Sequence, residues 1–233
     1  MGPPGNRQNK ENTTVKRLDH AEPGKRNTLK RLLAAARVEF ASKGLAGARV
    51  EDIARDAGIT KQLVYHYYGS KDGLFVAVLD ESSETIMSEL VGLNVESLAP
   101  PAALRAMLNH FFDQYRDDPL LGDLALEGIR YHHSHQTPRN RFLELAPALI
   151  EKLDSILKRG ALSGEFRPDI NPRLLLASAA LLTSGWFTNR YSVSALTGLD
   201  TESAEGMATW REYSAQWVLA SIAGGKNNTG GSA

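Results

Sequence analysis

Apolar residues recur along this chain at helical spacing, and no segment shows the alternation of apolar and polar residues that marks a half-buried strand. The first clear case runs from Leu29 to Phe40, where apolar side chains repeat every three or four residues and so share one helical face. Asn27 or Thr28 can cap the start of this helix, and Gly44 can end it. The pattern predicts an all-α protein.

Shorter helices follow, separated by glycine turns. The second helix covers residues 50–57 and is ended by Gly58. The third covers residues 60–68 with Thr60 as its N-cap, and a fourth begins after Ser70, which can cap it in turn. A helix, a tight turn and a second helix in this order form the helix-turn-helix pattern.

Prolines mark the starts of longer helices in the rest of the chain. The helices that these signals delimit lie near residues 101–117, 120–134, 138–160 and 171–190, with a last one near 201–223. Residues 164–170 can be extended, although they are few and include a proline. The second half of the chain is therefore predicted to be a set of packed helices.

The third helix is the segment whose chemistry stands out. A helix that enters the major groove must show a polar face to DNA while its other face packs on the helices behind it. At 100° per residue, Val64, Tyr67 and Tyr68 fall on one side, and Gln62, Tyr65 and His66 fall on the other. The outward side is therefore expected to be polar, aromatic and able to form hydrogen bonds.

These side chains suit the groups that a DNA duplex exposes. Gln62 can make a bidentate contact with adenine, and Lys61 can reach a guanine edge or a phosphate. The hydroxyls of Tyr65 and Tyr67 suit phosphate oxygens, and Lys71 with the first backbone N–H groups of the fourth helix suits another phosphate. The alternative is an amphipathic helix with a solvated face, because many helical proteins contain such a turn without binding DNA.

Charge is unevenly divided along the chain, although it sums to zero. Residues 1–72 hold 14 Lys and Arg against 8 Asp and Glu, and residues 73–233 hold 13 against 19. This split favours a polyanionic partner for the first part, although basic tails are also common without one.

The stretch from Leu29 to Leu79 resembles the N-terminal domain of the TetR family of regulators. The matching runs are LLAAARVEFASKG, VEDIARDAGIT and KQLVYHYYGSKDGLFVAVLD. The family pattern begins with an Ile-Ala pair, an Ala-Gly turn and a hydroxyl cap, which are here Ile53-Ala54, Ala57-Gly58 and Thr60. It continues with aromatic residues, a Lys-acid pair and a Leu, which are here Tyr65, Tyr67, Tyr68, Lys71-Asp72 and Leu74. Two residues depart from the pattern. Arg49 replaces the usual Ser or Thr cap before the second helix and can instead meet a phosphate, and Gln62 replaces a small residue, which leaves the preferred DNA sequence open.

The resemblance implies a homodimer that binds a palindromic operator in double-stranded DNA, usually as a repressor, and releases it when a small organic effector binds the C-terminal domain and moves the fourth helix. The expected DNA contacts are Arg49, Thr60, Lys61, Gln62, Tyr65, His66, Tyr67 and Lys71. A basic arm with Lys16, Arg17, Lys25 and Arg26 is expected to add salt-sensitive affinity, with the minor groove as one place for it.

The expected architecture is an N-terminal three-helix helix-turn-helix DNA-binding domain, linked by a fourth helix to a helical ligand-binding and dimerisation domain. The boundaries predicted from composition and pattern are a disordered arm at 1–26, the DNA-binding domain at 27–75, the effector-binding and dimerisation domain at 76–223 and a disordered tail at 224–233.

The helices near 171–190 and 201–223 are the candidates for the dimer interface, and burial within one chain is the alternative. The last helix carries Met207, Trp210, Ser214, Trp217 and Ser221 along one stripe. Candidate effector-lining residues, each of which can equally be plain core, are Phe111, Phe112, Tyr115, Leu126, Ile129, Arg130, His133, Leu149 and Trp186.

Several other classes of protein find little support. Cysteine is absent, which excludes disulfides and fits a cytoplasmic protein, and no apolar run is long enough to span a membrane or to act as a secretory signal. Of His132, His133 and His135, only His132 and His135 have helical ligand spacing, whereas zinc needs three or four ligands. The three histidines suit a solvated helix end, so no metal or cofactor is expected. No catalytic motif is visible, so we expect no enzyme. The alternatives are a helical small-molecule enzyme and a protein-interaction module without DNA binding.

Overall fold

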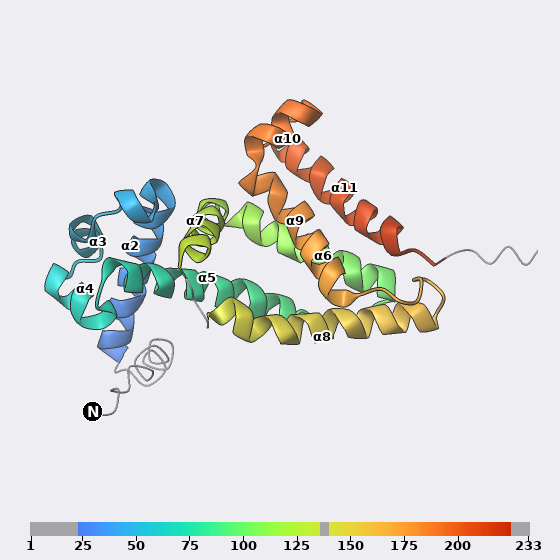
Figure 1. Ribbon diagram of the computed structural model, residues 1–233, viewed down its shortest axis with the longest axis horizontal. Coiled ribbons are helices and arrows are strands. Elements are labelled where there is room, and N and C mark those ends of the chain that lie inside the picture. Colours follow the sequence, from blue (N-terminus) through green and yellow to red (C-terminus); the bar gives the residue numbers. More distant parts are fainter. Residues whose placement is uncertain (1–22, 136–139, 225–233) are drawn as a thin grey trace, which may run out of the picture. The chain divides into compact units, whose positions relative to one another are not determined.

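The computed structural model describes residues 23–135 and 140–224, and the chain divides into two compact units, Met1–Glu81 and Ser82–Ala233. Over these described ranges every named element is an α-helix (Figure 1), as the apolar spacing predicts. One isolated antiparallel bridge joins Phe166 to Ala223, inside the stretch that the sequence allows to be extended.

The N-terminal unit consists of α2 (Pro23–Gly47), α3 (Val50–Asp56), α4 (Lys61–Tyr68) and the first part of α5 (Lys71–Gly92). The apolar face predicted for the first helix is buried. Its side chains, each at most 4% exposed, are Leu29, Leu32, Leu33, Ala36 and Phe40. The Phe40 ring meets the ring of Phe75 edge-on, with 5.0 Å between centroids, and so joins α2 to α5.

The turns of this unit follow the sequence signals closely. Gly44 leaves helical geometry (φ 65°, ψ 173°), which interrupts α2 where the first helix was expected to end. Gly58 takes a left-handed φ of 66° between α3 and α4, a conformation that a side chain would strain. The Thr60 hydroxyl then accepts a hydrogen bond from the backbone N–H of Leu63 at 3.3 Å, which confirms the predicted cap.

The turn from α4 into α5 is equally specific. The Ser70 hydroxyl accepts a hydrogen bond from the Gly73 N–H at 2.9 Å, as the expected cap of the fourth helix requires. A Cβ at Gly73 would lie 2.2 Å from the carbonyl oxygen of Tyr68, closer than any real contact. Only glycine lets the chain turn this sharply, so the end of α4 is fixed by backbone packing.

The start of the first helix was predicted wrongly. α2 begins at Pro23, not at Asn27 or Thr28, and the Thr28 hydroxyl donates to the Gly24 carbonyl oxygen at 3.0 Å inside the helix. Proline is well accepted in a first helical turn because its missing N–H is not needed there. The expected arm therefore overlaps the helix at residues 23–26, and residues 1–22 lie outside the described residues, as does the tail from 225 onward.

The C-terminal unit begins within α5, between Glu81 and Ser82, whereas the sequence suggested a boundary after residue 75. Its further helices are α6 (Pro100–Asp117), α7 (Leu121–Ser134), α8 (Arg141–Leu162), α9 (Pro172–Thr188), α10 (Arg190–Thr197) and α11 (Ala204–Ile222). The helix expected from 138 is described from Arg141. Helix α10 was not predicted. The backbone at Asn189 is not helical (φ −127°, ψ 36°), and this residue separates α9 from α10.

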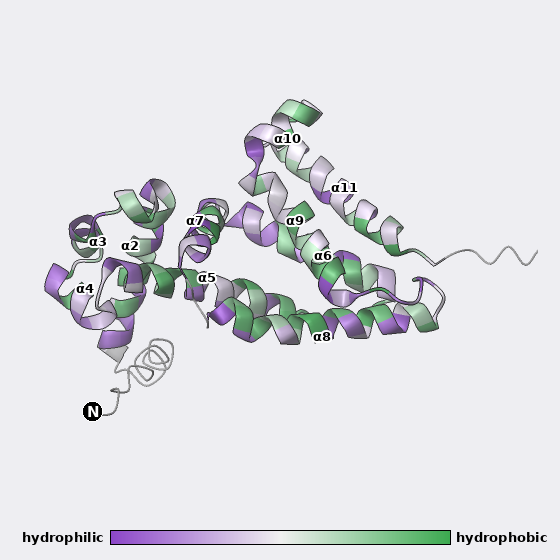
Figure 2. Cartoon of the chain, in the orientation of Figure 1, coloured by the Kyte–Doolittle hydropathy of each residue, from purple (hydrophilic) through white to green (hydrophobic). Residues whose placement is uncertain are grey.

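Two apolar clusters hold this unit together. The larger one joins α5, α6, α8, α9 and α11, and includes Leu153, Ile156 and Val218, each at most 2% exposed. The smaller one is aromatic and is centred on Trp186 and Phe187. Hydrophobic stretches run along α8 and α9 (Figure 2). Across the described residues, no helix has both the length and the apolar character needed to cross a bilayer.

Candidate functional site

Helix α4 has the two-sided character that its sequence predicts. On its inner side Val64 is completely buried, while on its outer side Gln62 and His66 are exposed and Tyr65 is 40% exposed. Tyr67 was predicted on the inward side with Val64 and Tyr68, but it is only half-buried and lies at the edge of the outward face. The caps at both ends fix the helix, so this polar surface is presented on a rigid element.

Lys61 opens this surface and has two neighbours. Its ammonium lies 2.5 Å from a carboxylate oxygen of Glu51, in the first turn of α3, and 5.6 Å from the centre of the Tyr65 ring. The hydrogen bond lowers the pKa of Glu51 and raises the pKa of Lys61. Sequence reasoning missed Glu51, because no local pattern indicates a contact between side chains ten residues apart on different helices.

Lys25 brings the beginning of α2 to the same surface. Its ammonium lies 5.6 Å from the centre of the Tyr67 ring, whose edge also contacts the ring of His66 with 5.4 Å between centroids. Lys25 is one of the basic residues expected near the DNA, and Arg26 beside it is exposed. Lys16 and Arg17 lie outside the described residues.

Arg49 precedes α3 and makes no side-chain cap, as its replacement of the usual Ser or Thr predicts. Its backbone N–H instead donates to the carboxylate of Glu39 at 3.1 Å, and its own side chain is exposed. The same carboxylate accepts from the Lys43 ammonium at 2.8 Å. Glu39 therefore supplies the cap from α2 and leaves the guanidinium of Arg49 available to solvent.

Lys71 forms hydrogen bonds with backbone carbonyl groups, which the sequence did not predict. Its ammonium donates to the carbonyl oxygens of Ala46 at 3.3 Å and Ala48 at 3.2 Å, both just before α3. Nearby, burial raises the pKa of the Tyr68 hydroxyl well above its ordinary value. The two bonds of Lys71 help to hold the start of α5 in place, and a phosphate contact by Lys71 stays a prediction.

The nine residues predicted to line an effector pocket are not brought together in one place. Phe112, Tyr115 and Trp186 belong to the aromatic cluster, with Phe111 packed beside it. Leu149 belongs to the larger apolar cluster, and Leu126 is half-buried. Ile129, Arg130 and His133 are exposed. Helical periodicity identifies the inward side of each helix, but it does not show which neighbour that side meets.

The aromatic cluster is closely packed. Phe112 and Tyr115 both lie against Phe187, at 4.9 and 5.4 Å between centroids, and burial raises the pKa of Tyr115 to about 12. Trp186 is fully buried and its indole N–H donates to the Thr201 carbonyl oxygen at 3.2 Å.

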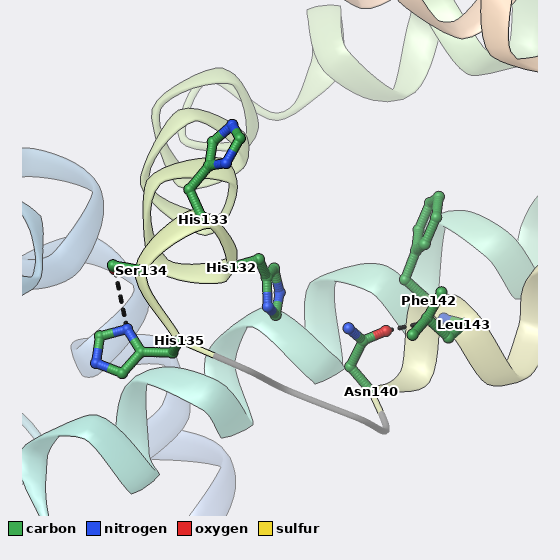
Figure 3. Close-up of a pocket in the computed structure, with 7 residues that line it drawn as sticks. All are labelled: His132, His133, Ser134, His135, Asn140, Phe142 and Leu143. Carbon is green, nitrogen blue, oxygen red and sulfur yellow. Dashed lines mark hydrogen bonds between the residues drawn. The ribbon is translucent and has the colours of Figure 1, made fainter.

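His133 lines an open depression at the α7–α8 connection, together with His132, Ser134, His135, Asn140, Phe142 and Leu143 (Figure 3). The three imidazoles point in different directions, and the ring of His135 stacks on Tyr131 with 4.2 Å between centroids. Within residues 23–135 and 140–224, no group of three or more His, Cys, Asp or Glu side chains is placed to hold a metal ion.

Helices α9 and α11 carry exposed apolar side chains. Leu174 and Leu181 on α9 are 68% and 75% exposed, and Trp217 on α11 is 52% exposed. The stripe predicted on α11 is split: Trp210 turns inward against Trp186, with 5.5 Å between centroids, whereas Trp217 points to solvent. Burial within one chain, the alternative given for these helices, therefore leaves part of their apolar surface exposed.

Both units match known families. Residues 32–78 match the model of bacterial regulatory proteins of the tetR family, and residues 100–218 match that of the tetracyclin repressor-like C-terminal domain. The HTH-type transcriptional repressor NicS of Pseudomonas putida is 26% identical over 81% of this chain and 89% of its own length. The HTH-type transcriptional repressor SCO4008 of Streptomyces coelicolor is 35% identical over 45% of this chain and 51% of its own length.

The fold also resembles solved structures. The regulator FadR of Bacillus subtilis, solved in complex with stearoyl-CoA, superposes with a TM-score of 0.65 at 18% identity, covering 83% of this chain and 99% of FadR. At this identity the likeness concerns the fold alone.

Proposed function

This chain belongs to the TetR family of bacterial transcription regulators, and we propose that α4 is the helix with which it recognises an operator. Proteins of this kind are DNA-binding repressors that respond to ligands, and the two units of this chain correspond to those two tasks. The observation that carries the proposal is the rigid, exposed polar face of α4, with Gln62, Tyr65 and His66 outward and Val64 buried behind them.

Each exposed group on this face has a suitable partner in a duplex. The Gln62 amide can pair with an adenine edge, and the ammonium of Lys61 can donate to a guanine edge or a phosphate. The hydroxyls of Tyr65 and Tyr67 and the exposed Arg49 guanidinium suit phosphate oxygens, which fix position and carry no sequence information. The further members of the proposed interface are Thr60, His66 and Lys71.

Lys25 supports an electrostatic contribution from the start of α2, because it lies against Tyr67 at the edge of α4. A cation at this place can neutralise a phosphate and release its counterion, which makes binding salt-dependent. Since the target is chromosomal DNA, we propose that the protein works in the cytoplasm.

The exposed apolar side chains of α9 and α11 support a homodimer through these helices. Leu181 and Trp217 leave apolar surface in water, and a second copy would cover it by packing four helices together. A palindromic operator requires this two-fold arrangement, with the two recognition helices about 34–36 Å apart or somewhat more.

We place effector binding in the C-terminal unit, near the part of the predicted set that lies together: Phe111, Phe112, Tyr115 and Trp186. Aromatic walls favour a small organic molecule with a large apolar part. The acyl-CoA bound by FadR, which shares this fold, is consistent with that class. We propose no catalytic role and no cofactor.

The DNA-binding proposal is tested by selecting duplexes that the full chain retains from a random pool and measuring their affinity by fluorescence anisotropy. Tyr65→Ala should weaken binding to every retained duplex, and the control Tyr191→Ala, at an 87% exposed tyrosine of α10, should not. Binding should fall steeply as salt rises. A Tyr65→Ala variant with unchanged affinity would refute the proposed interface, and a chain that retains no duplex would favour a protein-interaction module.

A further inference from the structure

The ion pair between Lys61 and Glu51 joins the proposed recognition helix to the helix before it. Lys61 is the one Lys or Arg within α4, so it supplies the permanent positive charge of that helix. Its ammonium lies 2.5 Å from the Glu51 carboxylate, and the two side chains are 48% and 52% exposed. Glu51 therefore places a negative charge at a surface that is proposed to meet a polyanion.

We propose that Glu51 is a specificity-determining residue that makes Lys61 discriminate between a base edge and a phosphate. The proposal rests on the DNA-binding function proposed above. A lysine ammonium has three donors, so Lys61 can keep its bond to Glu51 and still donate to the neutral oxygen or nitrogen of a guanine edge. A phosphate at the same place carries its own negative charge and meets repulsion from Glu51.

The ion pair between Lys61 and Glu51 weakens binding to non-operator DNA more than binding to the operator. On a duplex without a guanine at the matching position, a phosphate is the main competing partner for Lys61, and binding it brings the phosphate charge against Glu51 unless the ion pair opens. The carboxylate is then left unpaired beside the sugar-phosphate backbone. On the operator, the ion pair between Lys61 and Glu51 persists, so Glu51 reduces the affinity for the operator only slightly. Glu51 thus acts through Lys61 as a positioning residue and as a charge that rejects non-operator contacts.

The chain offers a matched control on the same helix. Asp56 ends α3 and pairs with Arg55 at 3.0 Å, not with α4. Asp56→Asn removes the same charge as Glu51→Gln from the same short helix, but it leaves the ion pair of Lys61 intact. The comparison separates an effect of net charge from an effect that passes through Lys61.

The experiment measures the affinity of the full chain, by anisotropy, for a duplex selected with the wild-type protein and for a scrambled duplex of equal composition. Glu51→Gln should bind the scrambled duplex about two- to fivefold more tightly, the range that an exposed ion pair is worth. Its affinity for the selected duplex should change less, so the ratio of affinities should fall. The salt slope on the scrambled duplex should steepen by about one, because one further phosphate contact forms.

Further variants show whether the effect passes through Lys61. Glu51→Asp, which keeps the charge, should restore much of the discrimination. In a Lys61→Met background, Glu51→Gln should change discrimination little. Thermal melting of each variant checks that the fold is kept.

Three results would overturn the proposal while leaving DNA binding itself intact: an unchanged or weaker affinity of Glu51→Gln for scrambled DNA, an equal gain for Asp56→Asn, or an undiminished effect without Lys61. A wild-type chain that retains no duplex would instead contradict the proposed function, and the inference would fall with it.

Discussion

The ammonium of Lys71 lies 3.2 Å from the carbonyl oxygen of Ala48, and this contact ties the start of α5 to the backbone just before α3. A second bond reaches the carbonyl oxygen of Ala46 at 3.3 Å. The two carbonyl oxygens lie at the end of α2, and both accept hydrogen bonds from a side chain that is 25 and 23 residues further along the chain. The turn that follows α4 is held by a charge-assisted contact as well as by its glycine and its cap.

Lys71→Met should therefore destabilise the N-terminal unit. The substitution keeps most of the apolar stem but leaves two carbonyl oxygens without their donor, at a cost of about 1–2 kcal/mol in the free energy of unfolding. Urea denaturation followed by circular dichroism measures this loss, and Lys30→Met, an exposed lysine of α2, is the control. Equal stability of the two variants would show that the contact with Ala46 and Ala48 contributes nothing.

Gln62→Ala should relax the choice of base at one operator position. If the amide makes a bidentate contact with adenine, its loss reduces discrimination there by about 1–3 kcal/mol and leaves the other positions unaffected. Titrations against operators that carry each single-base substitution give the pattern. A uniform loss at all positions would mean that Gln62 contacts the backbone, and an unchanged pattern would remove it from the interface.

Leu181→Glu should disrupt the proposed dimer. The side chain is 75% exposed in the single chain, so the substitution leaves the monomer's core intact but puts a charge where a second copy is expected to pack. Sedimentation velocity should show a shift toward monomer. Leu162→Glu, at a 90% exposed leucine of α8, should leave the assembly unchanged. A dimer that tolerates Leu181→Glu equally well would place the interface elsewhere.

Tyr115 should make the protein sensitive to alkali. Burial raises the pKa of its hydroxyl to about 12, so the folded state keeps a proton that the unfolded chain loses near pH 10. The contribution of this group is fully present below pH 10 and is lost progressively as the pH rises toward 12, at about 1.4 kcal/mol per pH unit. Tyr115→Phe should reduce this slope, whereas Tyr191→Phe, at an 87% exposed position, should not. Identical alkaline slopes in wild type and Tyr115→Phe would contradict the assignment.

Much of the N-terminal unit could be predicted from local rules. The spacing of apolar residues from Leu29 to Phe40 identified the buried face of α2, because side chains at this spacing lie on one side of a helix and pack together into the core. Thr60 marked the start of α4 and Gly58 the turn before it, since caps and left-handed turns depend on residues close by. The outward position of Gln62 followed from helical geometry alone.

Contacts between helices were beyond these rules. The bond between Lys61 and Glu51 and the bonds from Lys71 to the end of α2 depend on how helices pack, which periodicity does not encode. The same limit explains why the predicted effector pocket is divided between two clusters and the surface. The helix predicted near 171–190 corresponds to α9, and no helix was predicted directly after it, so α10 was missed.

The most direct test of the account is chemical modification of His66 by diethyl pyrocarbonate, in the free protein and in complex with a selected duplex. His66 is exposed on α4, and His132 and His133 are exposed on α7 as internal controls. If α4 lies in the major groove, bound DNA should protect His66 strongly while the α7 imidazoles react as fast as before. A complex in which His66 reacts at its free rate would contradict the claim that α4 is the recognition helix.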